Sequence, residues 1–459
     1  MPYQRGEDIN IGVGMENPAA RGTIVAPQAW IPGRTPTGIA PVVEKVLLKE
    51  TRATSIESEG SEIVQKRAEG DLEFNVRCNS LGYLLKSLLG KCTTTETETG
   101  EVYSHKFEVL TQNPEYPSLS LGLSQPGGQD YQYGLALVNK LELKTPVDDL
   151  VNATVSFIAA KEEEKEGSPF TVSFADNDYY FRNRDVKVKM ADSYDDLDSA
   201  AAMSLKEFSL SIENSARVNQ NIGELNPGNV IALVQSIKAT MKADYFENLD
   251  QKIGGTGKEY TLKTAVSEDA TDKQTFTPTK KYQTKIVFKA TAKGTGDWTV
   301  IVHDSENNLV ALQVIKNADI AVGYNTAILP WTWTSGEYHV HIISSVADGK
   351  VATSTTEDLE TAEMSFYYKT NRDYFTAGLY KALRVEIERT DKTIGTSSHP
   401  KLVIDLPKVS FETWTPDRPI DDIVGESVEL TAHYDGSEGV AKAIDITLVN
   451  ETANYNHAS

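Results

Sequence analysis

Two stretches of this 459-residue chain match each other position by position and decide its fold. The first is Pro146-Val-Asp-Asp-Leu-Val-Asn-Ala-Thr-Val-Ser-Phe-Ile-Ala159, and the second is Pro419-Ile-Asp-Asp-Ile-Val-Gly-Glu-Ser-Val-Glu-Leu-Thr-Ala432. They align along their whole length without a gap, at an offset of 273 (419 − 146). In both, a polar loop leads into residues that alternate between apolar and polar, as in a half-buried strand. Such an internal repeat indicates one structural unit that occurs twice.

A weaker similarity lies upstream of each stretch. Glu44-Lys-Val-Leu-Leu-Lys-Glu-Thr51 resembles Glu207-Phe-Ser-Leu-Ser-Ile-Glu-Asn214 at an offset of 163 (207 − 44). The two offsets differ by 110, so we expect an insert of about that length within the second copy. Gly- and Thr-rich stretches, such as Gly254-Gly-Thr-Gly257, bound the range 252–363. We predict an independent surface domain there, because insertions are tolerated at exposed loops.

The rest of the chain is also mainly β in pattern. Alternating runs predict strands at 71–76, 140–144, 154–158, 207–212, 402–406 and 428–432. Helical patterns are few, the clearest covering 79–90 and 373–383. We therefore expect a mainly β fold of tandem-duplicated β-sandwich units with short flanking helices, plus an inserted Ig-like or jelly-roll-like β-sandwich.

These patterns predict the domain boundaries. Residues 1–40 are rich in Pro and Gly and indicate an extended N-terminal arm without its own core. The remaining segments are a first unit at 41–165, a second unit at 166–251 and 364–450, the insert at 252–363, and a frayed tail at 451–459.

Composition excludes several classes of function. The chain has 45 basic and 66 acidic residues, a formal charge of −21, which argues against tight binding of nucleic acid. No apolar run is long enough to span a membrane, and no secretory signal is visible at the start. Cys78 and Cys92 are expected to be free thiols, since two cysteines make no disulfide framework.

No set of residues has the spacing of a catalytic or metal site. The stretch Gly254–Lys258 lacks the spacing of a phosphate-binding loop, and the acidic run Asp192–Asp198 lacks the pattern of a calcium loop. His339 and His341 share a strand face, with His303 elsewhere, but two histidines and an uncertain third ligand favour ordinary sheet histidines. We expect no enzyme activity, no cofactor and no metal.

Aromatic residues concentrate in the predicted insert. Trp331, Trp333 and Tyr338 are the candidate surface ligand contacts, because Trp331 and Trp333 point to one face of an extended segment. The alternative is that these rings form the core of the domain, since aromatic side chains bury large areas.

Three segments together resemble the tail tube, or major tail, proteins of long non-contractile-tailed bacteriophages. They are 57–74, the Leu81-Gly-Tyr-Leu-Leu-x-x-Leu-Leu-Gly90 helix, and the closing sequence from Leu406 to Asn450. The resemblance covers roughly residues 1–251 and 364–450 and excludes the insert. It implies sandwich units whose long hairpins form a barrel shared between chains, in stacked rings through which DNA is ejected.

The resemblance implies that six units close a ring. With two units per chain, the internal repeat then predicts trimeric pseudo-sixfold rings, with hexameric rings as the alternative. The implied partners are further copies of the chain and other tail proteins, such as the tape measure and the tail terminator. DNA would pass through the lumen without specific binding, helped by carboxylates that repel phosphate. The protein would be made in the host cytoplasm and located in the virion, without membrane contact. The N-terminal arm would reach neighbouring rings, and the insert would decorate the exterior and bind host surfaces weakly.

Two other classes remain as alternatives. One is a β-sandwich adhesin or carbohydrate-binding surface protein, and the other is an enzyme with an accessory sugar-binding domain. The first normally needs an export signal, and the second needs a catalytic constellation that the sequence lacks.

Overall fold

The computed structural model divides the chain into two compact units, which we describe separately. Unit 1 comprises 1–244 and 378–459, and unit 2 comprises 245–377. The residues that the structure describes are 5–35, 38–49, 58, 60–200, 202–244, 249–252, 259–266, 274–276, 283–328, 337–352, 364–368, 371–418, 425–437 and 440–457.

Unit 1 contains two sets of six strands with the same order along the chain and the same order in the sheet. The first set is β1 (Asn10–Met15), β3 (Ala40–Leu47), β4 (Ser61–Asn75), β7 (Leu119–Ser124), β8 (Tyr131–Pro146) and β9 (Asn152–Glu164), paired in the order β1-β7-β8-β9-β4-β3. The second set is β10 (Val186–Ala191), β11 (Glu207–Glu213), β14 (Ser236–Asp244), β25 (Tyr380–Glu388), β26 (Lys401–Asp417) and β27 (Gly425–Ala432), paired in the order β10-β25-β26-β27-β14-β11. We call these sets copy 1 and copy 2.

The remaining elements of unit 1 extend or cover this framework. They are β2 (Ala29–Ile31), β5 (Gly90–Glu98), β6 (Val102–Val109), β12 (Arg217–Asn219), β13 (Asn229–Ile231), β28 (Asp445–Asn450), the helix α1 (Leu81–Leu89) and the 3-10 turns Gly6–Asp8, Pro18–Ala20 and Asn183–Asp185. Among the described residues, the 12 strands of the two copies form one sheet of 16 strands together with β2, which pairs with β1, and with β28, β6 and β5, which follow β26 in that order.

The strand register confirms that the two copies are equivalent. In copy 1 Lys144 lies opposite Asn152, and in copy 2 Asp417 lies opposite Gly425, so both partners shift by the same offset of 273 (417 − 144 and 425 − 152). Between Ala136 and Lys144, each residue pair of the β8–β9 ladder has a counterpart in the β26–β27 ladder at the same offset of 273. Each hairpin also has its irregularity at the equivalent place, after Val138 in β8 and after Phe411 in β26. A bulge is a specific feature of a ladder, so shared register and shared bulge together indicate a duplicated fold.

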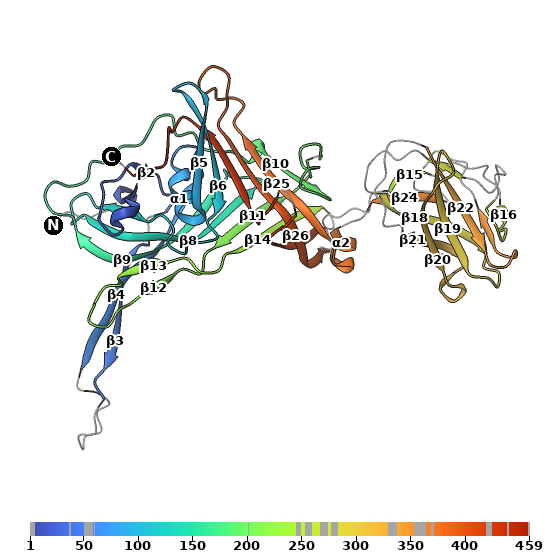
Figure 1. The fold of residues 1–459 in the computed structure, drawn as a ribbon, viewed down its shortest axis with the longest axis horizontal. Helices are drawn as coiled ribbons and strands as arrows, with labels where there is room; N and C mark the ends of the chain where they lie inside the picture. Colours follow the sequence, from blue (N-terminus) through green and yellow to red (C-terminus); the bar gives the residue numbers. More distant parts are fainter. Residues whose placement is uncertain are drawn as a thin grey trace. The chain divides into compact units, whose positions relative to one another are not determined.

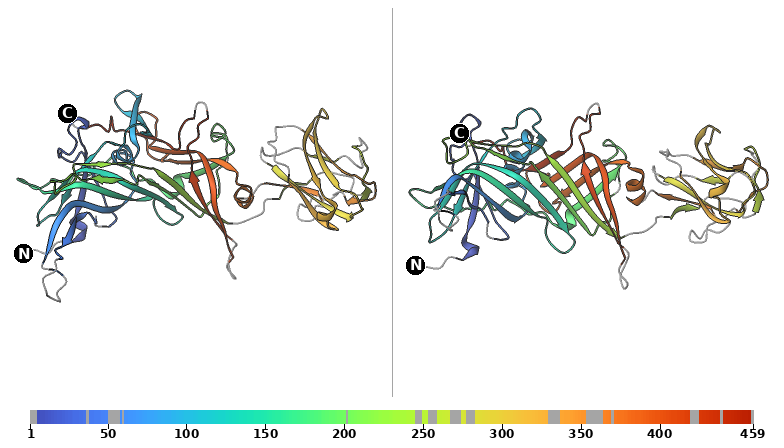
Figure 2. Two further views of the ribbon diagram at one scale, coloured as in Figure 1. Left: turned by 60° about the horizontal axis from the view of Figure 1, so that its bottom comes forward. Right: turned by 90° about the horizontal axis from the view of Figure 1, so that it is seen from below.

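Copies 1 and 2 are joined by pairing of β8 with β11. Lys140 lies opposite Glu213 and Pro146 opposite Glu207, on the edge of β8 that faces away from β9. The result is a continuous run of eight antiparallel strands in the order β3-β4-β9-β8-β11-β14-β27-β26, which lie side by side in Figure 2. We call this run the eight-stranded sheet.

The core of unit 1 lies on one face of the eight-stranded sheet. Alternate residues of its strands are buried there, including Leu141, Leu143, Val155, Phe208, Leu210, Met241, Val428 and Leu430. Helix α1 packs against β8 on this face, and its Leu81 and Leu85 line a small cavity together with Leu141 of β8 and Ile446 of β28. The helix ends at Gly90, whose φ of 91° is readily adopted by glycine at a C-cap.

Unit 2 is a β-sandwich. One sheet contains β15 (Leu249–Lys252), β16 (Glu259–Thr261), β18 (Gln283–Ala292), β21 (Gly323–Ile328), β23 (Lys350–Ala352) and β24 (Met364–Tyr368). The other contains β17 (Gln274–Phe276), β19 (Trp298–Asp304), β20 (Leu309–Ile315) and β22 (Tyr338–Ser344). Buried residues of both sheets, such as Phe288, Trp298 and Val340, form one core, with the Phe288 and Trp298 rings stacked 5.9 Å apart. A 3-10 turn, Asn317–Asp319, and the helix α2 (Asn371–Ala377) complete the unit.

Both chain ends differ from expectation. The prediction of a coreless arm at 1–40 is wrong for its described part, because β1 pairs with β7 and buries Ile11, Val13 and Met15. The frayed tail at 451–459 is also wrong at Tyr455, which is 1% exposed and packs on Gly82, where a Cβ atom would lie 2.0 Å from the ring. Pro- and Gly-rich composition suggested loops, but long-range pairing and packing decided the outcome.

Two further expectations need correction. The helix at 79–90 is present as α1, but that at 373–383 ends at Ala377, and β25 begins at Tyr380. The weak similarity of 44–51 to 207–214 has the wrong register. The pairs Ala40–Glu69 and Ser211–Lys238 occupy equivalent places, so the offset between β3 and β11 is 171 (211 − 40) in place of the expected 163 (207 − 44). Alternating strands match at any even shift, so local pattern alone does not determine the offset.

Candidate assembly surfaces

The face of the eight-stranded sheet opposite the core is polar. Its outward side chains are Glu69, Asp71 and Glu73 of β4, Thr154 and Ser156 of β9, Lys140, Glu142 and Lys144 of β8, Glu207, Ser209, Ser211 and Glu213 of β11, Lys238, Thr240 and Lys242 of β14, and Ser427, Glu429 and Thr431 of β27. We call this set the polar face. Lys140, Ser211, Thr240 and Glu429 line one hollow on it.

Carboxylates outnumber lysines on the polar face, and most of its lysines are paired. Glu142 Oε2 lies 3.3 Å from Lys140 Nζ, and its Oε1 lies 3.1 Å from Lys144 Nζ. Partial burial acts to raise the pKa of Glu142, but the lysine contacts outweigh it and hold that pKa below its ordinary value. Lys242 Nζ lies 2.6 Å from Glu207 Oε2. Such ion pairs contribute little to stability, but they neutralise the cations that would otherwise attract phosphate.

Two projections leave copies 1 and 2 at equivalent places. The first is the outer part of β3 and β4, which extends away from the rest of unit 1 in Figure 1, and the second is the β11–β14 connection, 214–235, which carries β12 and β13. Lys66 donates its backbone N–H to the carbonyl of Leu225 at 2.9 Å, so the two projections touch. Exposed apolar side chains mark both: Val43, Val46, Leu47, Leu48, Ile63 and Val64 on the first, and Ile222, Leu225, Leu233 and Val234 on the second.

Each end of the eight-stranded sheet presents a strand edge. β3 pairs with β4, and no second strand among the described residues pairs with it. β26 pairs with β25 as far as Ser410 on one edge, and with β27 as far as Asp417 on the other. Beyond Ser410, the edge on the β25 side has no strand partner in the described part of the chain at Thr413, Thr415 or Asp417. Natural sheets rarely leave such edges uncovered.

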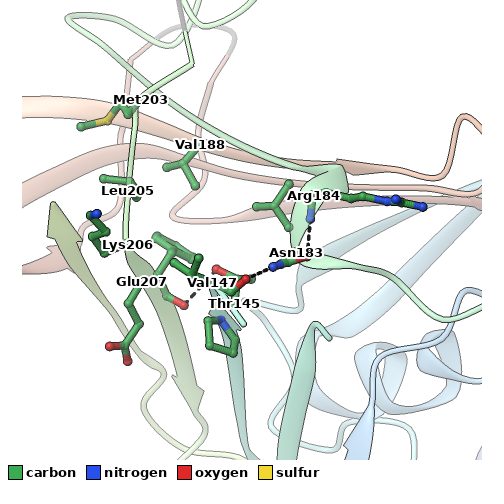
Figure 3. Close-up of a pocket in the computed structure, with 12 residues that line it drawn as sticks. Thr145, Val147, Asn183, Arg184, Val188, Met203, Leu205, Lys206 and Glu207 are labelled. Atoms are coloured by element: carbon green, nitrogen blue, oxygen red, sulfur yellow. Dashed lines mark hydrogen bonds between the residues drawn. The ribbon is translucent and has the colours of Figure 1, made fainter. Parts of the chain in front are cut away.

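A hollow lies at the junction of copies 1 and 2. It lies between the end of β8, the start of β10 and the start of β11, and Asn183 reaches across it to the Val147 carbonyl (Figure 3). Its 12 lining residues include no histidine or cysteine, and its charged members are Arg184, Lys206 and Glu207.

The predicted ligand contacts do not come together as a site. Tyr338 is 4% exposed and belongs to the core of unit 2, as the alternative interpretation expects, so its ring is not a surface contact. Trp331 and Trp333 lie outside the described residues. His303 and His341 have ring centroids 5.4 Å apart, yet the described residues contain no group of three potential metal ligands.

The acidic run and the cysteines have structural surroundings. Asp192 pairs with Lys381, and Asp198 with Arg384, which also lies 2.6 Å from Asp405, so the acidic run is tied to β25. Both cysteines are free thiols, and burial raises the pKa of Cys78 to about 12. Within the described residues, no helix has both the length and the apolar character that crossing a membrane requires.

Comparisons with known proteins identify the family. A family model described as phage tail tube protein matches residues 32–297. No curated protein matches the chain. Solved structures include an infectious bursal disease virus Gt strain, 9% identical over 95% of this chain and 81% of that chain, with a TM-score of 0.12. The VP2 subviral particle of the same virus is 9% identical over 91% and 77%, also at 0.12.

TM-scores this low carry no argument, whereas the family match covers more than half of the chain and agrees with a mainly β fold built of duplicated strands. The chain therefore belongs to the phage tail tube protein family and is a structural protein of the virion tail.

Proposed function

We propose that this chain assembles into rings of three, and that the rings stack into the tube through which the phage genome is ejected. The observation that carries the proposal is the eight-stranded sheet. It consists of two equivalent four-stranded halves and presents a strand edge at each end. A ring of three chains then has six equivalent halves and pseudo-sixfold symmetry.

The closing of several chains into one barrel explains why the eight-stranded sheet presents a strand edge at each end. A strand edge exposes N–H and C=O groups and is a ready template for another chain. When chains join end to end and the rotation closes, the barrel has no edges left. Three chains with eight strands each supply 24 strands to one barrel.

The polar face suits the wall of a DNA conduit. The opposite face is the core of unit 1, so the polar face is the side available to line a lumen. Its excess of carboxylates repels the phosphate backbone, and its paired lysines offer few cations for phosphate to displace. DNA thus passes without specific binding.

The two projections provide the contact between stacked rings. Their exposed apolar side chains, from Val43 to Val64 and from Ile222 to Val234, form a surface of the kind that marks an interaction site. Unit 2 shares no sheet with unit 1 in the described residues, so it can decorate the tube exterior without interrupting the barrel. There it would bind host surfaces weakly, through residues that include Trp331 and Trp333.

Tube ends would contact the other tail proteins, such as the tape measure and the tail terminator. The protein performs this role without catalysis, cofactor or metal.

Electron microscopy of concentrated protein, with mass measurement of single rings, tests the proposal. We expect tubes whose rings contain three chains and whose lumen is lined by the polar face. Rings of six chains would reject the stoichiometry, and protein that stays monomeric at high concentration would reject assembly as the function.

A basic variant tests the lumen separately. Glu142→Lys with Glu429→Lys replaces two carboxylates of the polar face by two ammonium groups in every chain. If that face lines the lumen, tubes of the variant should retain double-stranded DNA at low salt and release it at high salt, whereas wild-type tubes retain none. Equal retention by both tubes would contradict the lumen assignment.

A further inference from the structure

The junction between copies 1 and 2 provides a template for the junction between neighbouring chains. Within one chain, β8 of copy 1 pairs with β11 of copy 2, with Lys140 opposite Glu213 and Glu142 opposite Ser211. If rings have pseudo-sixfold symmetry, the same relation must recur from copy 2 of one chain to copy 1 of the next. This argument rests on the proposed function and adds the residue-level register.

In the internal junction, β8 supplies one of the two paired strands. The strand equivalent to β8 in copy 2 is β26, and the corresponding part of its edge has no strand partner in the described residues. The offset of 273 places Thr413, Thr415 and Asp417 of β26 where Lys140, Glu142 and Lys144 stand in β8. At those β8 positions, one edge holds β9 and the other holds β11. On β26, the edge equivalent to the β9 side holds β27, and the edge equivalent to the β11 side has no strand at these three residues within the described chain.

The strand equivalent to β11 in copy 1 is β3, and it also has one edge without a strand partner in the described residues. Asn75 and Asp244 lie opposite equivalent residues of β9 and β27, which relates β4 to β14. Through β4 and β14, Ala40 then corresponds to Ser211, and Val42 to Glu213. β11 has β14 on one edge and β8 on the other, whereas β3 has β4 on one edge and no second strand in the described residues.

We infer that β26 of one chain pairs antiparallel with β3 of the next, with Val42 opposite Thr413, Ala40 opposite Thr415 and Gly38 opposite Asp417. We call this the ring joint. The partner is a second copy of this chain, because only the relation already present inside the chain supplies both the strand and its register.

The residues at the two edges fit this assignment. Of the six residues paired at the ring joint, only Asp417 is charged, and it lies opposite Gly38. No like charges therefore face each other across the joint. Each edge also contains a proline, Pro41 in β3 and Pro416 in β26. Both prolines direct their backbone toward the joint, because positions 38, 40 and 42 direct theirs toward β4 and Pro416 is equivalent to Leu143, which faces β11 in the internal junction. A proline has no N–H, so each one removes a hydrogen bond from the joint. Prolines at such positions guard sheet edges against indiscriminate pairing, which suits chains that wait in solution before assembly.

The backbone geometry identifies the best position for a test. Gly38 donates its N–H to the Asp71 carbonyl at 2.9 Å, so positions 38, 40 and 42 direct their N–H and C=O groups toward β4. Across the ring joint these positions are therefore non-hydrogen-bonded pairs, with Cα atoms about 4.5 Å apart. That separation lies within the range that a disulfide spans.

Disulfide trapping tests the ring joint. Tubes of the Val42→Cys, Thr413→Cys variant are oxidised and run on a denaturing, non-reducing gel. We expect most of the protein as covalent trimers that return to monomers on reduction. The natural thiols compete poorly, since burial raises the pKa of both Cys78 and Cys92.

Two matched variants control for register and geometry. Lys140→Cys with Glu213→Cys places the same pair at the internal junction, and it should form an intramolecular bond even in monomers. Val42→Cys with Asp417→Cys is out of register along the joint and should form at least tenfold less cross-linked product.

The outcomes separate the ring joint from the proposed function. In-register cross-links that extend to six chains keep the ring joint and reject the three-chain ring. Normal tubes without cross-links, or with equal cross-linking of the out-of-register pair, overturn the ring joint and leave the tube function intact. Absence of both tubes and cross-links, while the internal control forms its bond, overturns both.

Discussion

Copies 1 and 2 share their strand pairings but few of their residues. In copy 1, Lys140 lies opposite Ser156, and at the equivalent place in copy 2 Thr413 lies opposite Glu429. Burial alternates in the same phase in both, with Phe157 and Leu430 both 1% exposed. The comparison teaches that the phase of burial and the position of the bulge maintain this sheet, while the outward residues are free to differ.

The copies differ most in what supports the bulge. In copy 1, Asn214 is buried and donates its side-chain N–H groups to the carbonyls of Leu88 and Val138, at 2.7 and 3.2 Å. Its backbone N–H also reaches the carbonyl of the bulge residue Asn139 at 2.7 Å. In copy 2, the bulge residue Glu412 is exposed and accepts a hydrogen bond from Ser410. Copy 1 is thus anchored to α1 and to β11, whereas copy 2 presents its bulge beside the open edge.

Removal of β1 should have the largest effect, because β1 is the strand of copy 1 that β10 matches in copy 2, and its apolar side chains are buried in the core. Deletion of residues 1–28 removes Ile11, Val13 and Met15 from the core, and burial of each is worth about 1.5–3 kcal/mol. We expect insoluble protein or loss of the folded β signal in circular dichroism. Deletion of 1–8 is the control and should leave the fold intact. Soluble, folded protein after the longer deletion would show that β1 is dispensable.

Core truncation at equivalent positions comes next. Phe157→Ala and Leu430→Ala should lower the free energy of unfolding of unit 1 by about 3–5 and about 2–5 kcal/mol respectively. Ser156→Ala and Glu429→Ala, their outward neighbours, should change it by less than about 0.5 kcal/mol. Urea unfolding monitored by intrinsic fluorescence measures all four. A large loss in one copy alone would mean that the two cores are not equivalent.

Substitutions at the two bulges should lower the free energy of unfolding by different amounts. Asn214→Ala leaves the carbonyls of Leu88 and Val138 without their side-chain donor, at a cost of about 1–3 kcal/mol. Glu412→Ala removes an exposed side chain and should cost no more than about 0.5 kcal/mol. Denaturant midpoints compare them directly, and equal costs would contradict the idea that only the copy 1 bulge is anchored.

The smallest effect concerns an ion pair of copy 2. Arg389 and Arg182 lie 2.9 and 2.7 Å from Asp391 and hold its pKa below the ordinary value of 3.8. Because the folded-state pKa is depressed, the stabilising contribution is present above about pH 3.8 and is lost as the pH falls below it. Asp391→Asn should therefore differ slightly from wild type at pH 6, and the two should converge toward pH 2. Denaturant midpoints across this range measure the effect, which is small because Asp391 is half exposed. A difference that grows on acidification would contradict the assignment.

Local sequence patterns were sufficient to predict most of the strands named in the sequence analysis and the duplication of the β unit. The alternation in Thr154–Ile158 and Val428–Ala432 predicts the strands that the structure contains, and the shared Pro-x-Asp-Asp loop relates β9 to β27. Helix α1 was also predictable, because apolar residues recur at helical spacing and Gly90 follows its end. The assembly surfaces were not predictable in this way, since the polar side chains of a strand look the same whether they face solvent, a lumen or another chain.

Long-range contacts explain the failures at the chain ends. Nothing local distinguishes the Gly- and Pro-rich start, in which Asn10–Met15 forms a buried strand, from a flexible arm. Tyr455 packs against Gly82, which lies in the first quarter of the chain, so no window around Tyr455 reveals its burial. The division of unit 1 into separate units at 41–165 and at 166–251 with 364–450 stays a prediction, because both copies belong to one compact body.

The amino-acid sequence alone determined that a β unit occurs twice and which residues form its hairpins, and its resemblance to tail tube proteins predicted a structural role. Only the tertiary structure decided the register between the copies, the burial of both chain ends and the location of the two open edges. The physical reason is that alternation with a period of two is local and survives any even shift, whereas a pairing partner is set by contacts between residues far apart in the chain.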